Sequence, residues 1–421
     1  MRFRLGIGVL FLAAGVAGQA FAVGPETSKR PVPRVADTAE VAADPVPNAK
    51  FEAWQEGFRA RALEQGLTPE LLAAALSGLT YDASVIERDR NQAEFSKTIW
   101  DYLDTAVSDL RVENGKRALA EWAETLDEIE ATYSVEKEIL VAIWGLESAY
   151  GAFRGSEPVI NGLATLAFDA RRAAFFEGEL IAALKILQTG DTVRSRMVGS
   201  WAGAMGHTQF MPSSYQAYAV DFDGDGKRNI WEDDPVDALA SAAAYLKHFG
   251  WQAGQPWGIE VRLPESFDYA LAARRVTGLP SAWAEIGIEP VRGDFDDAHG
   301  LGSILLPGGS EGAAFLIFEN FSVIEKYNTA DAYVIGIGHL ADRIAGGAPI
   351  EQPWPRRLRA LTRDERVELQ DRLNTAGYGE LVLDAKMGPL TVNAVRAFQR
   401  AQGVTPDGYP SLDVLERLRA L

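Results

Sequence analysis

Apolar residues recur every three or four positions along most of the chain, the spacing that brings them to one face of a helix. This spacing begins at Phe51 and runs through "FEAWQEGFRARALEQG", "NQAEFSKTIWDYLDTAVSDL" and "KRALAEWAETLDEIEATY". In "TPELLAAALSGL", Thr68 fits a helix N-cap and Pro69 fits the first turn. Only residues 257–320 contain strand-like runs, "GIEVRLP" and "AAFLIFEN". The chain is therefore predicted to be mostly α, with a small β element.

Two stretches interrupt the helical pattern and suggest a division into domains. Residues 23–50 are rich in Pro, Ala and charged residues without any period, which predicts a flexible linker. Residues 344–360 fall in "AGGAPIEQPWPRRLRAL", where Gly and Pro predict a second linker. The main body is then expected to span residues 51–343, with a small unit at residues 361–421.

The N-terminus has the pattern of a secretory signal peptide. It reads "MRFRLGIGVLFLAAGVAGQAFA", in which Arg2 and Arg4 precede a short apolar run and a small-x-small cleavage site. A membrane anchor is the alternative, but the run is short and contains glycines. We therefore expect residues 1–22 to be cleaved from an exported protein that keeps no membrane span.

Composition excludes several classes of function. The chain has no cysteine, so it forms no disulfide, thiolate metal site or lipidated N-terminal cysteine, which fits a periplasmic protein. Its formal net charge of −18 argues against nucleic acid as a partner, because phosphate binding needs clustered Lys and Arg. The four histidines are scattered without an HExxH pattern, which disfavours a zinc site.

A glutamate lies on an apolar helix face in "SVEKEILVAIWGLESAYG". Glu147 follows Ile143 by four positions and Ile139 by eight, so it shares their face. A carboxylate among apolar groups loses hydration, which raises its pKa and keeps it protonated, ready to donate a proton. The alternatives are a carboxylate at the rim of the core and one paired with an arginine such as Arg154. Spacing alone favours a structural role over a catalytic one.

Residues 221–232, "DFDGDGKRNIWE", match the complete D-x-[DN]-x-[DN]-G-x5-E pattern of a calcium loop. The pattern assigns ligand oxygens to Asp221, Asp223, Asp225, the backbone carbonyl of Lys227, and Glu232. Three carboxylates so close together repel one another without a cation, so we expect a structural Ca²⁺. An Asp/Gly-rich turn without metal is one alternative. An EF-hand sensor is a weaker one, because the chain has a single loop.

Taken together, these motifs resemble the lytic murein transglycosylases of the membrane-bound B type. The resemblance spans residues 50–343 and is carried in order by "VIERDRNQAEFSKTIWDYL", "ILVAIWGLESAYG", "GSWAGAMGHTQFMPSSY", "YAVDFDGDGKRNIWEDDPVDALASAAAYL" and "FENFSVIEKYNTADAYVIGIGHLADRI". It implies a lysozyme-like α+β catalytic domain that acts on peptidoglycan glycan strands. The bond cut is the β-1,4 link from N-acetylmuramic acid to N-acetylglucosamine, and the product carries a 1,6-anhydromuramoyl end.

The resemblance also implies roles for individual residues. It makes Glu147 the single catalytic acid and base, and it implies no cofactor for catalysis. Its neighbour Ser148 is the less favoured candidate for a catalytic residue. Substrate-binding roles carry over to Ser200, Gln209, Tyr245, Tyr327, Asn328 and Tyr333. For each tyrosine, core packing is the alternative. In this family an aspartate after the loop can close the calcium site, so either Glu232 or Asp237 completes the shell.

Residues 361–421 resemble the small three-helix peptidoglycan-binding domain through "LQDRLNTAGY", "MGPLTVNAVRAFQRAQGV" and "DGYPSLDVLERL". Its expected core consists of Leu369, Leu373, Val395, Phe398 and Leu415. Asp384-Ala385 stands where the family often has Asp-Gly, which makes the shape of that turn an open question. The resemblance implies a unit that tethers the enzyme to the wall; a helical appendage that stabilises the body is the alternative.

Two other functions compete with a lytic transglycosylase. One is a peptidoglycan-binding scaffold that keeps the fold without activity. The other is a lysozyme-type hydrolase that uses water, which would need a second carboxylate in the cleft. The expected partners are peptidoglycan glycan strands and, as a further class, other cell-wall enzymes.

Overall fold

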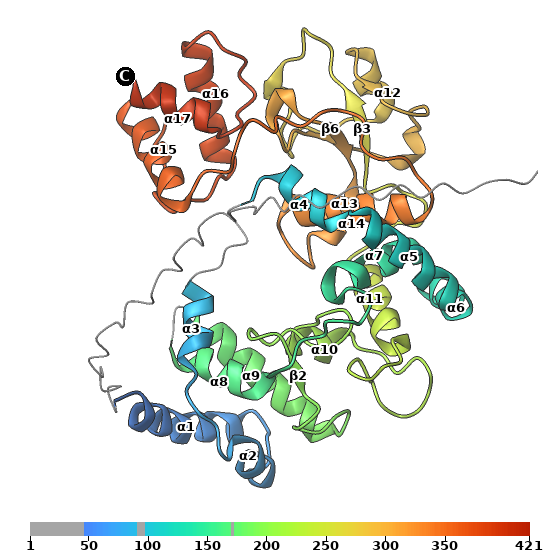
Figure 1. The fold of residues 1–421 in the computed structure, drawn as a ribbon, viewed down its shortest axis with the longest axis vertical. Helices are drawn as coiled ribbons and strands as arrows, with labels where there is room; N and C mark the ends of the chain where they lie inside the picture. Colours follow the sequence, from blue (N-terminus) through green and yellow to red (C-terminus); the bar gives the residue numbers. More distant parts are fainter. Residues whose placement is uncertain (1–45, 91–96, 170–171) are drawn as a thin grey trace, which may run out of the picture. The chain divides into compact units, whose positions relative to one another are not determined.

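The computed structural model describes residues 46–90, 97–169 and 172–421. The predicted signal peptide and most of the predicted linker 23–50 lie outside these residues. Helices dominate the described part of the chain, which confirms the predicted mostly α fold (Figure 1). None of its helices is both long enough and apolar enough to cross a membrane.

The body is built mainly of helices. Before the glutamate motif come α1 (Val46–Glu64), α2 (Pro69–Leu76), α3 (Ala83–Arg90), α4 (Ile99–Ala106), α5 (Asp109–Glu121) and α6 (Ala123–Tyr133). The middle of the chain forms α7 (Lys137–Ser148), α8 (Val159–Phe168), α9 (Ala173–Thr189), α10 (Pro212–Tyr218) and α11 (Val236–His248). The body ends with α12 (Pro280–Glu285), α13 (Glu319–Ile324) and α14 (Asp331–Ile344). Helix α1 starts five residues before the predicted Phe51, inside the segment predicted as a linker.

Helix α7 is at the centre of the main core. Its residues from Ile139 to Gly145 are all buried, as expected for a helix that is apolar on every side. Helices α5, α6, α11 and α14 pack around it. Each buried aliphatic side chain contributes about 1.5–3 kcal/mol relative to an exposed one. The position of α7, and hence of its last turn, is therefore set by core packing.

Strands lie mostly where the sequence predicted them. An antiparallel sheet in the order β4-β3-β6-β5 is formed by β3 (Gly258–Arg262), β4 (Glu289–Pro290), β5 (Ser303–Leu305) and β6 (Ala314–Ile317). It has its own small core, in which Val261 and Leu316 meet Phe267 and Trp283. A second pair, β1 (Glu157–Pro158) and β2 (Val198–Gly199), lies outside the predicted β region, in the loops near the glutamate motif.

The C-terminal unit consists of α15 (Arg363–Thr375), α16 (Pro389–Ala401) and α17 (Leu412–Arg419), seen together in Figure 1. All five core residues predicted for this unit are buried in one cluster. Ala385 adopts the left-handed conformation, with φ of 65°. Its N–H donates to Gln370 Oε1 at 2.9 Å, and Gln370 Nε2 donates to Asp384 Oδ1 at 3.1 Å. The turn in which the family often has glycine therefore forms with alanine, and buried Gln370 holds it.

The segment between α14 and α15, predicted as a linker, lies against the body. It has no helix or strand from Ala345 to Ala360. Arg356 makes a bidentate ion pair with Asp104 at 2.7 and 2.8 Å, and the Trp354 ring lies 6.2 Å from that of Trp100. These contacts order a segment whose composition alone suggested flexibility.

Buried polar contacts also join α16 and the turn after it to loops around the sheet. Asp407 Oδ2 accepts from Ser310 N at 2.8 Å and from Ser310 Oγ at 3.0 Å. The guanidinium of Arg396, which is 6% exposed, donates to the Ala272 carbonyl at 2.7 Å. The C-terminal unit is thus held by hydrogen bonds as well as by its covalent connection.

Asp407→Ala is expected to loosen this attachment, because Ser310 then loses its acceptor in a part-buried place. Removing one partner of a buried hydrogen bond costs about 1–3 kcal/mol. We expect faster limited trypsin cleavage after Arg356, Arg357 or Arg359, followed by mass spectrometry of the fragments. The matched control is Glu380→Ala on the exposed surface of the same unit. Equal cleavage rates in the two variants would contradict the proposed attachment.

Candidate functional site

Glu147 lies in the last turn of α7 and is partly exposed. The hydroxyl of Tyr333, from the first turn of α14, donates to Glu147 Oε1 at 2.5 Å. Burial and the nearby Glu147 carboxylate raise the pKa of Tyr333 well above its ordinary value. Tyr333 therefore stays protonated and acts as a permanent hydrogen-bond donor to one oxygen of Glu147.

The chain leaves α7 through a left-handed turn immediately after the glutamate. Ala149 and Tyr150 have φ of 50° and 60°, a conformation that side chains rarely adopt and that stores strain at functional sites. Ser148 Oγ offsets part of this strain, because it accepts from Gly151 N at 3.0 Å and donates to the His207 carbonyl at 2.6 Å. Ser148 is therefore a structural anchor of the turn.

Ser200 and Gln209 lie next to the chain that leaves this turn. A Cβ on Gly155, where φ is 84°, would lie only 2.7 Å from Ser200 N, so the two backbones touch. Gln209 Nε2 donates to the Arg154 carbonyl at 3.0 Å and to the Gly206 carbonyl at 2.8 Å. Ser200 Oγ accepts from Ala204 N at 3.0 Å. Both predicted polar residues thus border the loop that follows Glu147.

The tyrosines predicted for the cleft form an aromatic group. The rings of Tyr245 and Tyr327 lie 4.8 Å apart, and both contact Phe210. Tyr245 donates its hydroxyl to the Lys326 carbonyl at 2.6 Å. The Tyr327 hydroxyl is buried beside Thr208, and within the described residues it has no partner at hydrogen-bonding geometry. Burial and the Glu147 carboxylate raise the pKa of Tyr327 well above its ordinary value, so it keeps its proton.

Asn328 is exposed, and its side chain turns back to its own backbone. Asn328 Oδ1 accepts from Ala330 N at 3.0 Å. The structure therefore brings Tyr327 and Tyr333 to the acid, with Tyr245 beside Tyr327, whereas Asn328 shapes the turn between the two tyrosines.

Sequence reasoning missed Arg274, which pairs with two acids on either side of Tyr327. Its Nη2 donates to Glu325 Oε1 at 2.9 Å and to Asp331 Oδ1 at 2.6 Å, on either side of Tyr327. The guanidinium lies 4.5 Å from the centre of the Phe321 ring. Arg274 lies 51 residues before Glu325 and belongs to no motif, so only the fold reveals this contact.

His207 was also missed, since the sequence gave only a scattered histidine. It is buried, and its Nδ1 lies 3.0 Å from Trp144 Nε1 on α7. Its Nε2 lies 2.6 Å from the Glu232 carbonyl at the end of the acidic loop. Burial, together with the positive charge of Arg154, lowers the pKa of His207 from its ordinary value. The ring is therefore neutral and joins the helix of Glu147 to the loop.

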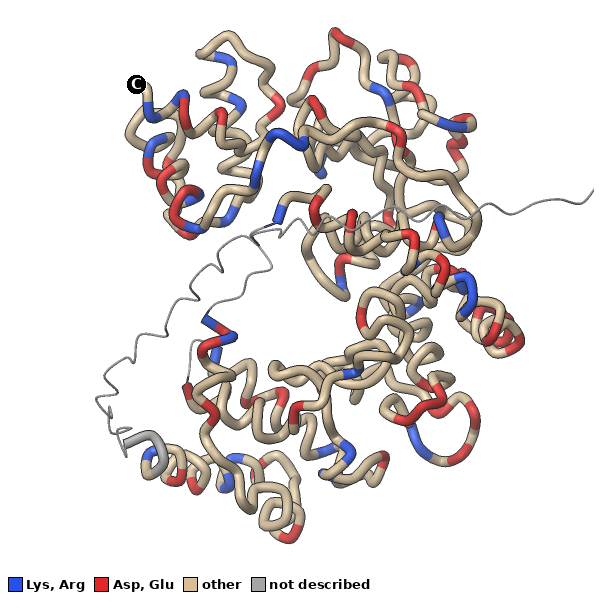
Figure 2. Tube along the Cα trace, viewed as in Figure 1, with Lys and Arg blue, Asp and Glu red and all other residues tan. Residues whose placement is uncertain are grey.

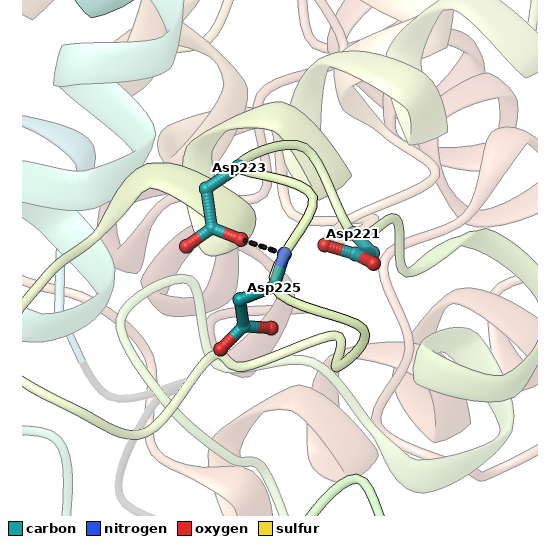
Figure 3. A group of neighbouring side chains, drawn as sticks. All are labelled: Asp221, Asp223 and Asp225. Atoms are coloured by element: carbon teal, nitrogen blue, oxygen red, sulfur yellow. Dashed lines mark hydrogen bonds between the residues drawn. The ribbon is translucent and has the colours of Figure 1, made fainter.

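The acidic loop has the geometry of a cation site. Acidic positions gather along it (Figure 2), and ligand atoms of Asp221, Asp223 and Asp225 all lie within 4.8 Å of one another. Figure 3 shows the three side chains around one turn, where Asp225 N donates to Asp223 Oδ1 at 3.0 Å. Gly226 has φ of 90°, as the sharp turn requires. Three converging carboxylates fit a hard cation such as Ca²⁺.

The two residues considered for the last ligand are placed differently. The Glu232 carboxylate pairs with Arg196 at 2.6 Å and is exposed. Asp237 is 3% exposed beneath the loop, where its oxygens accept from Phe222 N and Asn229 N, both at 2.7 Å. This burial raises the pKa of Asp237, and the backbone hydrogen bonds oppose the shift. Lys227, whose carbonyl is the remaining predicted ligand, lies in the exposed part of the turn. Glu232 is thus engaged by Arg196, whereas Asp237 lies under the backbone of the loop.

Comparison with known proteins gives two family matches along the chain. The model described as "Transglycosylase SLT domain" matches residues 50–342. The model described as "Putative peptidoglycan binding domain" matches residues 362–418. Both resemblances predicted from the sequence are therefore confirmed.

Similar proteins come from two bacteria. Membrane-bound lytic murein transglycosylase B of Escherichia coli (strain K12) is 34% identical over 243 residues, which cover 56% of this chain and 64% of that protein, under two thirds of its length. SltB3 of Pseudomonas aeruginosa, solved in complex with NAG-anhNAM-pentapeptide, is 46% identical with a TM-score of 0.85, covering 88% of this chain and 99% of that one. Slt35 of Escherichia coli, solved in complex with calcium, is 30% identical with a TM-score of 0.60, covering 71% and 93%.

Removal of divalent cations is expected to destabilise this protein, because the three aspartates then repel one another. A ligand at about 100 times its Kd stabilises the folded state by about 2.7 kcal/mol. EDTA should therefore lower the Tm in thermal unfolding, and excess Ca²⁺ should restore it. Asp221→Asn should lose this response, whereas Glu285→Gln, a change of an exposed acid on α12, should keep it. An unchanged Tm with EDTA would refute the calcium site.

Proposed function

The chain belongs to the transglycosylase SLT domain family, and we propose that it is a peptidoglycan lytic transglycosylase. In this proposal it cleaves the β-1,4 bond between N-acetylmuramic acid and N-acetylglucosamine and forms 1,6-anhydromuramoyl ends. The 46% identity to SltB3, solved with an anhydro-sugar peptide, supports this substrate and product. The observation that carries the proposal is the Tyr333 hydroxyl 2.5 Å from Glu147 Oε1, at the end of a buried helix.

Glu147 acts twice in the proposed reaction. As a carboxylic acid it gives its proton to the glycosidic oxygen while the bond from that oxygen to C1 of the muramic acid breaks. As a carboxylate it then accepts the proton of the C6 hydroxyl while O6 bonds to C1. The proton returns to Glu147 and no water is consumed. Because nucleophile and electrophile belong to one sugar, the second step gains from proximity.

The charges around the site favour this single-carboxylate reaction over a lysozyme-type hydrolysis. A hydrolase needs a second carboxylate as nucleophile or base. Glu325 and Asp331, which lie on either side of Tyr327 in the sequence, are both paired with Arg274. Their pairing leaves them poorly suited to that role and supports the use of the substrate's own hydroxyl.

The polar groups around Glu147 suit a sugar substrate. Tyr333 donates to Oε1 and so orients the Glu147 carboxyl group for proton transfer. Tyr327 lies beside Glu147 with its ring against that of Tyr245, and these aromatic rings are proposed to line the sugar site. Gln209 donates through Nε2 to two carbonyls, so its Oε1 is the atom proposed to meet an N-acetyl N–H. Ser200 and Asn328 complete the proposed binding set.

We assign the cation site a structural role. Asp221, Asp223, Asp225 and the carbonyl of Lys227 would hold Ca²⁺, with Asp237 closing the shell in preference to Glu232. The ion supplies positive charge that offsets the repulsion among the carboxylates. The relative solved in complex with calcium supports this choice of metal.

Residues 361–421 are proposed to bind the wall polymer, after a connection at residues 344–360 and a catalytic domain at residues 51–343. The family match over residues 362–418 supports this division. We propose that the protein is exported to the periplasm, where its substrate lies, and that other wall enzymes are its protein partners. The contacts of Asp407 and Arg396 would keep the wall-binding unit at a fixed distance from Glu147.

Glu147→Gln tests the proposed function. The amide cannot donate a proton as an acid or accept one as a base, so release of muropeptides should fall at least about 100-fold. Purified peptidoglycan would be digested and the products identified by mass spectrometry. The control, Glu113→Gln, changes an exposed acid on α5 and should release anhydro-muropeptides at the wild-type rate. Reducing muramic ends from the wild type would indicate a hydrolase, and binding without release would indicate a scaffold.

Tyr333→Phe should retain the fold and lose part of the activity. It removes a hydrogen bond to a charged group, worth about 1.5–3 kcal/mol, and frees the carboxylate to rotate. We expect kcat to fall roughly 10- to 100-fold, measured as the rate of anhydro-muropeptide release. Tyr81→Phe is the control, since that hydroxyl bonds Asp169 in another part of the body. An unchanged kcat would exclude the orienting role.

A further inference from the structure

His207 contacts two structures that the proposed mechanism treats separately. On one side lies α7: Trp144 Nε1 donates to His207 Nδ1 at 3.0 Å, and Ser148 Oγ donates to the His207 carbonyl at 2.6 Å. On the other side lies the exit of the acidic loop. There His207 N donates to the Ile230 carbonyl at 3.1 Å, and His207 Nε2 lies 2.6 Å from the Glu232 carbonyl. Arg154 Nη1 also lies 3.0 Å from His207 Nε2, so this one buried residue has polar neighbours on both sides.

The partners of the ring decide its tautomer. An indole N–H can only donate, so Nδ1 of His207 must be the acceptor and carry no proton. A backbone carbonyl can only accept, so Nε2 must carry the proton and donate to Glu232. Arg154 Nη1 lies 3.0 Å from His207 Nε2, but a neutral imidazole whose Nδ1 is an acceptor must carry its proton on Nε2, so Arg154 donates to the Glu232 carbonyl instead, at 2.7 Å. The tautomer is thus fixed by groups from both sides, and either bond is lost if one side moves.

The ring has little freedom to adapt by shifting. His207 is 2% exposed, and a Cβ on Gly151 would lie 2.7 Å from its Cε1 and Nδ1. Gly151 belongs to the left-handed turn that ends α7, one turn after Glu147. The imidazole therefore packs directly on the backbone of that turn.

The loop exit is continuous with the cation loop. Ile230 follows Asn229, whose N–H donates to Asp237 Oδ2 at 2.7 Å beneath the loop. Trp231 N and Glu232 N both lie within hydrogen-bonding distance of Asn229 Oδ1, at 3.2 and 3.3 Å. The backbone that presents the Ile230 and Glu232 carbonyls to His207 is therefore ordered by the same residues that shape the loop.

We propose that His207 is a positioning residue that couples the cation loop to the last turn of α7 and so sets the orientation of Glu147. In this coupling the cation loop, once its aspartates hold Ca²⁺, would fix the carbonyls of Ile230 and Glu232, and His207 would hold Trp144 and Ser148 in place. The catalytic half of the proposal rests on the proposed function. The structural half, in which a change in the cation loop alters the hydrogen bond of Trp144 through His207, does not depend on the proposed function.

His207→Asn and His207→Gln form a matched pair that breaks one contact at a time. Asn Oδ1 stands where Nδ1 stood and still accepts from Trp144, but the side chain is too short to reach the Glu232 carbonyl. Gln Nε2 stands where the imidazole Nε2 stood and still donates to that carbonyl, but Trp144 loses its acceptor. His248→Asn, a change of an exposed histidine on α11, is the control.

The first readout is the indole N–H resonance of Trp144 in the full chain labelled with ¹⁵N-tryptophan, assigned by comparison with Trp144→Phe. Addition of CaCl₂ to EDTA-treated wild type should shift this resonance. In His207→Asn the resonance should start at the wild-type position and no longer respond to Ca²⁺. In His207→Gln it should be displaced with or without Ca²⁺. Isothermal titration calorimetry should still detect Ca²⁺ binding in both variants.

The second readout is the rate of anhydro-muropeptide release. Both variants should lose kcat by roughly 10- to 100-fold, the size expected from misplacing a catalytic group, with little change in KM. Circular dichroism would verify the fold of each variant. A Trp144 shift on Ca²⁺ addition in His207→Asn equal to that of the wild type would overturn the coupling, as would no shift in the wild type. If the wild type releases no anhydro product, the proposed function fails, while the resonance experiment still decides the coupling.

Discussion

The burial of α7 on every face is the constraint on which the candidate site depends. A helix packed by α5, α6, α11 and α14 cannot turn or slide without opening voids in a core of crystal-like density. Glu147 is in its last turn, so core packing sets the position of the carboxylate. Only the direction in which the carboxylate points is left to polar contacts, and these come from segments distant in sequence.

Each of those polar contacts acts on a different part of the site. Tyr333 binds one oxygen of Glu147 directly. Ser148 and His207 hold the strained left-handed turn that follows, and Arg274 holds the segment that brings Tyr327 and Tyr333 over the acid. The bonds of Ser148 and His207 are buried and offset the strain of the turn, because a buried polar group without a partner would cost more. The position of the site residues is thus fixed by contacts with the surrounding segments rather than by contacts among themselves.

The connection to the C-terminal unit shows how side chains can override composition. Its Gly and Pro residues predict a flexible linker, yet Arg356 and Trp354 attach it to the body, and Asp407 attaches the unit that follows. In the proposed function, an attached wall-binding unit would present the polymer at one distance from Glu147, whereas a free tether would raise its local concentration over a range of distances.

The amino-acid sequence by itself was enough for the mostly α fold, the family, the core of the C-terminal unit and the position of the acidic loop. These rest on periodic spacing and on ordered local motifs, which survive without knowledge of long-range contacts. It also pointed to Glu147, although apolar spacing alone favoured a structural carboxylate. The tertiary structure decided the contacts between residues that are distant in the sequence, which the spacing of residues along the chain does not encode. Arg274 and His207 contact segments that are distant in sequence and come near them only in the folded chain. Glu232 pairs with Arg196 while Asp237 lies beneath the loop, because burial and charge pairing are set by neighbours in space.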